Sequence, residues 1–188
     1  MNVYDFDKTI FYPDSSATFL KWEARRHPAY LAVWIPAILW RGLLLELGTI
    51  SKTRFKESLF LVLRRVPDVD SDVRIFWDEH ENMICPWYLA QKKDSDLIIS
   101  ASPEFLIAPI AKRLGIPFIS TRMDKRTGRI IGENCFGEEK VRRFYKEYPG
   151  ARIDSFYSDS RSDLPLAKIA ERAFLVEQKG QKPVPWHE

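Results

Sequence analysis

Val3-Tyr4-Asp5-Phe6-Asp7-Lys8-Thr9, almost at the start of the chain, decides how the rest of the sequence is interpreted. A short apolar run leads into two carboxylates, Asp5 and Asp7, that are two residues apart. Because alternate residues of a strand point to the same face, both carboxylates can address one reacting centre where a strand ends. The alternative is an aspartate-rich turn in which Thr9 caps a helix. The segments that follow decide between the two.

The composition is that of one globular domain with a sizeable insertion. The chain has 188 residues, of which 45% are hydrophobic and 29% charged, and this excludes wholesale disorder. Its formal net charge of +3 permits attraction to phosphates or to an anionic membrane. Cys85 and Cys135 show no Cys-x-x-Cys spacing, and no secretory leader precedes Asp5. A cytoplasmic setting is therefore expected.

Two other classes of function receive no support from the residue pattern. His27, His80 and His187 are scattered without the spacing of zinc ligands, so a structural zinc site is not expected. Arginine and lysine are spread along helical segments and do not form a basic strand surface interleaved with aromatic residues. No nucleic-acid partner is expected.

The periodicity of the chain changes near residue 94. Before it, apolar residues recur at helical spacing, as at Phe55, Leu59 and Leu63. After it, short strand-like runs alternate with helical segments. The runs are residues 96–100, 116–119, 153–158 and 173–176, with a hairpin in 122–136 and helices in 102–114, 138–148 and 162–172.

This alternation predicts an α/β fold with a doubly wound, Rossmann-like parallel sheet covered by helices on both faces. The catalytic core is expected to comprise residues 1–12 and 94–188. Residues 13–93 are expected to form a helical cap inserted after the first motif.

Polar residues follow several of the predicted strands. Asp5 and Asp7 follow the first, Ser100 ends the second, and Asp159 follows the run at 153–158. Lys140 lies early in an intervening helix. Ligands of open α/β sheets bind at the carboxyl ends of the strands, so these segments are expected to converge on one edge.

In these motifs the chain resembles the haloacid dehalogenase (HAD) superfamily of phosphohydrolases, in the branch with a helical cap after the first motif. The matching strings are Asp5-Phe6-Asp7-Lys8-Thr9, Leu97-Ile98-Ile99-Ser100-Ala101-Ser102, Gly137-Glu138-Glu139-Lys140 and Tyr157-Ser158-Asp159-Ser160-Arg161-Ser162-Asp163. Lys8 replaces a frequent glycine, and Ser158-Asp159-Ser160 replaces a common Gly-Asp-Gly. Neither change removes a catalytic group, so both bear on the subfamily only.

The resemblance implies a phosphomonoesterase with three central side chains. Asp5 would be the nucleophile that takes up the phosphoryl group as an aspartyl phosphate. Asp7 would protonate the leaving alcohol and then activate water. Lys140 would neutralise phosphate charge and hold the carboxylate of Asp5. The alternative for Lys140 is a solvated helix face shared with its charged neighbours.

The resemblance also implies how the phosphate is held. Ser100 would donate a hydrogen bond to a phosphoryl oxygen, helped by backbone N–H groups near Ser102 where a helix begins. Thr9 and Ala101 complete the expected substrate-binding residues. The alternative for Ser100 is a helix cap with no substrate role.

Mg2+ is the cofactor that the resemblance implies. Asp5 and Asp159 would bind it through their side chains, Asp7 through its backbone carbonyl, and Asp163 directly or through water. Mg2+ prefers one or two carboxylates together with substrate phosphate and water. The alternative for Asp159 and Asp163 is helix capping and surface charge.

The substrate depends on the cap. Residues 25–48 begin with two arginines and continue into a very apolar segment, interrupted by Pro36, Arg41 and Glu46, which make it a poor membrane span. An interfacial segment at the inner face of an anionic membrane is one interpretation, and a buried cap helix is the other.

Two families share the motifs most closely. Residues 25–48, Cys135–Lys140 and Tyr157–Ser160 are similar to HAD-type phosphatidylglycerophosphate phosphatases, which implies a lipid headgroup as substrate. Asp14 stands where phosphoserine phosphatases carry a glutamate that meets the substrate amine, although it also suits a helix N-cap. A soluble phosphatase of phosphoserine or another small metabolite is thus the rival, and a non-catalytic phosphate-binding relative the third alternative.

Overall fold

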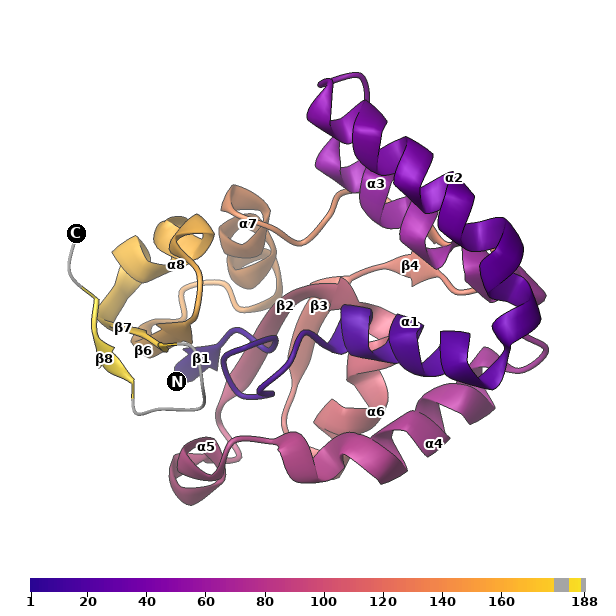
Figure 1. The fold of residues 1–188 in the computed structure, drawn as a ribbon. Helices are drawn as coiled ribbons and strands as arrows, with labels where there is room; N and C mark the ends of the chain where they lie inside the picture. The colour runs from indigo at the N-terminus through magenta and orange to yellow at the C-terminus, as the bar shows by residue number, and fades with distance from the viewer. Residues whose placement is uncertain (178–182, 187–188) are drawn as a thin grey trace.

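The computed structural model describes residues 1–177 and 183–186, and its described part contains a six-stranded sheet with helices on both faces (Figure 1). The strand order is β3-β2-β1-β6-β7-β8, with every neighbouring pair parallel except β7 and β8. The strands are β1 (Asn2–Tyr4), β2 (Leu97–Pro103), β3 (Phe118–Thr121), β6 (Ile153–Ser158), β7 (Ala170–Leu175) and β8 (Val184–Pro185). The predicted doubly wound α/β fold is confirmed.

Most of the helices lie between β1 and β2 in the sequence. Those that do are α1 (Ser15–Arg26), α2 (Pro28–Glu46), α3 (Lys52–Leu59), α4 (Val69–His80) and α5 (Pro86–Gln91), with short 3-10 helices η1 (Phe60–Arg65) and η2 (Glu81–Met83). The remainder are α6 (Glu104–Leu114), α7 (Glu138–Glu147), η3 (Arg161–Asp163) and α8 (Leu164–Ile169). A small hairpin, β4 (Met123–Asp124) and β5 (Arg129–Ile130), follows β3.

Alternating side chains of the strands separate two hydrophobic clusters, one on each face of the sheet. Tyr4 and Ile98 pack into a large cluster with residues of α1, α4, α5 and α6. Val3 and Leu97 face the other way, into a smaller cluster with residues of α7 and α8. The alternation follows from the period of two along a strand. The order of the strands places the carboxyl end of β1 between those of β2 and β6.

The helices between β1 and β2 fall into two groups. The cluster on the α6 face contains Phe19 of α1 and Trp77 of α4, so these two helices belong to the core on that face of the sheet. By contrast, α2 and α3 lie side by side and project away from the sheet (Figure 1). The expected boundaries of the cap, residues 13–93, remain a prediction.

Two details differ from the sequence-based expectations. The expected helix over residues 162–172 ends at Ile169, because Ala170–Leu175 pairs with β6 as a parallel strand. The sequence also offers Asp70 or Ser71 as the N-cap of α4, but the N-cap is Asp68, whose Oδ1 accepts from the backbone N–H of Ser71 at 3.0 Å. Within the described residues, no helix is both long and apolar enough to cross a membrane.

Candidate active site

Asp5, Lys140 and Asp163 form a buried ion cluster at the carboxyl edge of the sheet. Asp5 follows β1, and its backbone N–H donates to the carbonyl of Tyr157 on β6 at 2.8 Å. Lys140, in the first turn of α7, places its Nζ 2.7 Å from Asp5 Oδ1 and 2.8 Å from Asp163 Oδ2. Ser158, the last residue of β6, donates a hydrogen bond to the same oxygen of Asp163 at 2.8 Å. Three segments distant in sequence are thereby fixed around one ammonium group.

The electrostatics of this cluster follow from its burial. Only 1% of the Lys140 side chain is exposed. Burial opposes its charge, but the carboxylates of Asp5 and Asp163 outweigh burial and raise the pKa of Lys140. Burial raises the pKa of Asp5, and the opposing effect of the Lys140 charge, which lowers this pKa, is smaller. Two buried carboxyl groups therefore share one ammonium group.

Asp7 lies beside this cluster, held by donors from two other segments. Its Oδ1 accepts the backbone N–H of Ser15 at 2.6 Å, and its Oδ2 accepts the hydroxyl of Ser102 at 2.5 Å. Burial and the charge of Asp14 raise the pKa of Asp7 to about 6, against these donors. The residue that follows Asp7, Lys8, has φ of 55°, a conformation in which glycine is favoured. The chain therefore turns sharply directly after Asp7.

The hydroxyls expected to hold phosphate lie along the end of β2. The Ser100 hydroxyl oxygen accepts the backbone N–H of Ser102 at 3.0 Å, which leaves its own proton available to donate. Ser100 and Ser102 are both buried. Thr9 contacts a different motif, because its Oγ1 accepts the backbone N–H of Asp159 at 3.0 Å. Thr9 therefore links the turn after β1 to the loop after β6.

Lys56 is a further cation at this site, and none of the sequence motifs includes it. It extends from α3, and its Nζ donates to the carbonyl of Ala101 and, at 2.9 Å, to Asn134 Oδ1. Burial lowers the pKa of Lys56 to about 8, although Asp7 and Asp14 oppose the shift. In the sequence Lys56 is one of many charges on an amphipathic helix. Only the packing of α3 over β2 distinguishes it.

The carboxylates at the ends of β1 and β6 suit a hard divalent cation. Asp163 Oδ1 is buried and lacks a hydrogen-bond partner among the described residues. Asp159 is half-buried, and burial raises its pKa. The carboxylates of Asp5, Asp159 and Asp163 do not all lie within 4.8 Å of one another. A bound Mg2+ would thus take waters and substrate phosphate as further ligands, as it does elsewhere.

A sequence profile of the haloacid dehalogenase-like hydrolases matches residues 3–168, and the chain therefore belongs to this family. Protein CicA of Caulobacter vibrioides is 28% identical over 183 residues, which cover 89% of this chain and 82% of that protein. A histidinol-phosphatase of Neisseria meningitidis is 32% identical over 96 residues, which cover 44% of this chain and 43% of that enzyme.

A solved structure of a protein of unknown function from Bordetella pertussis has a similar fold. It is 25% identical, its TM-score is 0.71, and the match covers 92% of this chain and 87% of that one. Together with the family match, these likenesses identify the chain as a hydrolase of the HAD phosphatase type.

The structure brings most of the expected site residues to one place. Lys140 donates hydrogen bonds to Asp5 and to Asp163, and Ser102 donates one to Asp7. Asp14, the residue that stands where phosphoserine phosphatases carry a glutamate, caps α1 by accepting the N–H of Ala17 at 2.9 Å. This hydrogen bond supports the interpretation of Asp14 as a helix N-cap.

Proposed function

We propose that this protein is a Mg2+-dependent phosphomonoesterase that forms an aspartyl phosphate on Asp5. The buried cluster of Asp5, Lys140 and Asp163 is the observation that supports this most strongly. Lys140 holds Asp5 Oδ1, so the second oxygen of the carboxylate is left to attack phosphorus. Bound Mg2+ would neutralise phosphate charge, with Asp5, Asp159, Asp163 and the Asp7 carbonyl as its ligands.

The reaction then takes two steps. In the first, an Asp5 oxygen forms a bond to phosphorus, the bond from phosphorus to the ester oxygen breaks, and Asp7 gives its proton to the departing alcohol. In the second, Asp7 takes a proton from water, which attacks phosphorus and releases inorganic phosphate and free Asp5. The N–H of Ser15 and the hydroxyl of Ser102 orient Asp7 for both transfers. Ser100 donates to a phosphoryl oxygen throughout.

Asp5→Asn tests this mechanism, because the amide keeps the shape of the side chain but is a poor nucleophile. The matched control is Asp94→Asn, at an exposed position before β2. Both variants and the wild type are assayed on a panel of phosphomonoesters with Mg2+ and with EDTA. We expect turnover by the wild type and D94N that EDTA abolishes, and none by D5N. Wild-type turnover by D5N would overturn the mechanism.

A lipid phosphate such as phosphatidylglycerophosphate is the substrate that we propose, because one side of α2 is apolar and exposed. Leu39, Leu43 and Leu47 follow one another at intervals of four and are 70%, 45% and 68% exposed. A helix presents such residues on one side. Trp40 beside them is 62% exposed, and aromatic side chains of this kind suit a membrane interface.

A pocket beside this helix adds charge to the same region. It has a volume of about 140 Å³ and lies between α2 and η1, with Trp34 and Ile38 on one wall. Arg41 and Arg65 also line it. Cations next to exposed apolar side chains favour contact with an anionic lipid surface.

The second candidate is a soluble phosphomonoester such as phosphoserine, which the partial likeness to a histidinol-phosphatase supports. Co-sedimentation with anionic vesicles separates the two candidates. We expect the wild type to sediment with vesicles and the double variant Leu39→Ser/Trp40→Ser to stay in solution. Leu89→Ser, at an exposed leucine of α5, is the control and should behave as the wild type. If the wild type does not sediment with the vesicles and turns over soluble phosphomonoesters faster than lipid phosphates, the lipid proposal is wrong.

A further inference from the structure

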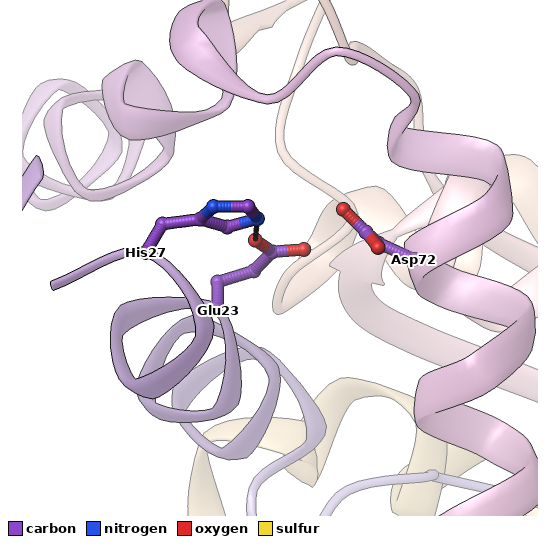
Figure 2. A group of neighbouring side chains, drawn as sticks. All are labelled: Glu23, His27 and Asp72. Atoms are coloured by element: carbon purple, nitrogen blue, oxygen red, sulfur yellow. Dashed lines mark ion pairs between the residues drawn. The ribbon is translucent and has the colours of Figure 1, made fainter.

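Glu23, His27 and Asp72 form a side-chain cluster that no motif of the proposed reaction includes. Glu23 lies on α1, His27 caps the carboxyl end of that helix, and Asp72 lies in the first turn of α4. One ligand atom of each approaches the other two within 4.8 Å, and His27 Nε2 is 3.8 Å from Glu23 Oε2. Figure 2 shows the carboxyl groups of Glu23 and Asp72 facing each other, with the imidazole beside them. This is the one such set of three within residues 1–177 and 183–186.

The carboxylate of Glu23 is buried without the donors that such a group needs. Glu23 is 2% exposed, and among the residues that the structure describes neither Oε1 nor Oε2 has a hydrogen-bond partner. A buried charged group without such partners is strongly unfavourable. Burial, with a contribution from Asp72, raises the pKa of Glu23 to about 7. A cation between the two carboxyl groups would remove this penalty.

The nearby protein cation does not satisfy the pair. Arg26 Nη2 is 3.5 Å from Asp72 Oδ1, at the limit of a hydrogen bond, and 42% of the arginine side chain is exposed. The guanidinium lies instead over the ring of Trp22, with its central carbon 4.6 Å from the ring centroid. Arg26 thus reaches Asp72 weakly, and no hydrogen bond joins it to Glu23.

We propose that Glu23, His27 and Asp72 bind a divalent transition-metal ion, with Zn2+ as the ion that fits best. One imidazole nitrogen and two carboxylate oxygens are ligands that Zn2+ accepts, with water in the fourth position, whereas Mg2+ prefers oxygen ligands alone. Zinc bonds of about 2.1 Å place tetrahedral donor atoms about 3.4 Å apart. The present spacing of 3.8 Å to at most 4.8 Å requires only modest side-chain rotation.

Such an ion would tie α1 to α4. These helices come from either end of the segment between β1 and β2, and the projecting pair α2 and α3 lies between them in sequence. The first residue of α1, Ser15, donates its N–H to Asp7. The ion would therefore stabilise the base from which α2 and α3 project, together with the helix that supports Asp7. This inference is independent of the proposed reaction.

The test uses the full-length protein, stripped with EDTA and then titrated with ZnCl2 in saturating Mg2+, which occupies the oxygen-ligand site. Metal content after desalting and thermal unfolding are measured for the wild type, Asp72→Asn, His27→Gln and the control Asp70→Asn. Asp70 is exposed on the same helix as Asp72. At a hundredfold excess of free Zn2+ over Kd, the expected rise in Tm is about 5–10 °C.

We expect the wild type and D70N to bind one more Zn2+ than D72N and H27Q, and only the first two to gain the Tm increase. Substitution with Co2+ should give a visible spectrum that D72N lacks. Equal Zn2+ content in all four proteins would overturn the proposal. The proposal would also be overturned if no protein took up the extra Zn2+ and D72N had a higher Tm than the wild type in EDTA. Glu23 and Asp72 would then share a proton and would not bind a metal ion. His27, partly exposed, provides the readout if D72N does not fold.

Discussion

Lys140→Met is the substitution with the largest expected effect on stability. It keeps an unbranched side chain of similar length but leaves Asp5 and Asp163 as buried carboxylates without the ammonium that lies 2.7 Å and 2.8 Å from them. Removing one partner of a buried ion pair costs about 3–5 kcal/mol. With a urea m-value of about 2 kcal/mol/M, the unfolding midpoint should fall by about 1.5–2.5 M. Urea unfolding is followed by far-UV circular dichroism, with EDTA present so that no cation replaces the lysine.

Lys146→Met on the same helix is the matched control, because Lys146 is exposed. Its free energy of unfolding should change by no more than about 0.5 kcal/mol. The double variant Lys140→Met/Asp163→Asn should recover part of the stability lost in K140M, because it removes one of the two unpaired charges. If K140M loses no more stability than K146M, the buried cluster does not have the energetics argued above.

The remaining predictions concern Lys56 and the turn of the β4–β5 hairpin. Burial lowers the pKa of Lys56 from 10.5 to about 8, so between these pH values the unfolded chain binds more protons than the folded protein. The free energy of unfolding of the wild type should therefore rise with pH in this range, relative to that of Lys56→Met. Urea unfolding from about pH 7 to about pH 10 measures this difference, and a constant difference would contradict it. Gly128 has φ of +70°, and an added Cβ would lie 2.7 Å from the carbonyl carbon of Phe60, so Gly128→Ala should cost about 2–4 kcal/mol in chemical unfolding. Gly132 has φ of +81°, but a Cβ added there would meet no atom within 4 Å, so Gly132→Ala should cost only about 1–2 kcal/mol. An equal loss of stability in the two alanine variants would contradict the steric argument.

The sheet, and the edge at which the candidate site lies, were predictable because both depend on local patterns. Short apolar runs alternating with helical segments specify parallel strands, and Gly115, with φ of 69°, ends α6 where a helix stop was expected. The end of α8 was not predictable in this way. Residues 170–172 suit a helix by local propensity, but pairing with β6 places them in the sheet.

Asp5, Asp7, Ser100 and Asp159 could be proposed from the sequence because each stands at or directly after the end of a predicted strand. Lys56, Glu23 and Asp72 have no such marker. Lys56 reaches Ala101 only because α3 folds over β2, and Glu23 meets Asp72 only because α1 packs beside α4. The absence of zinc-ligand spacing around His27 reflects the same fact, since the proposed third ligand comes from a distant helix. Long-range packing, not spacing, brings such residues together.

The central claim is that Asp5 carries the phosphoryl group, and acid-quenched mass spectrometry tests it most directly. The wild type and Asp5→Asn are mixed with the best phosphomonoester of the panel and Mg2+, quenched within the first turnovers, digested and analysed. We expect a peptide containing Asp5 that is heavier by one phosphoryl group and loses it on treatment with hydroxylamine. D5N should give no modified peptide. Full turnover by the wild type with phosphate never found on Asp5, or found on another residue, would contradict the account.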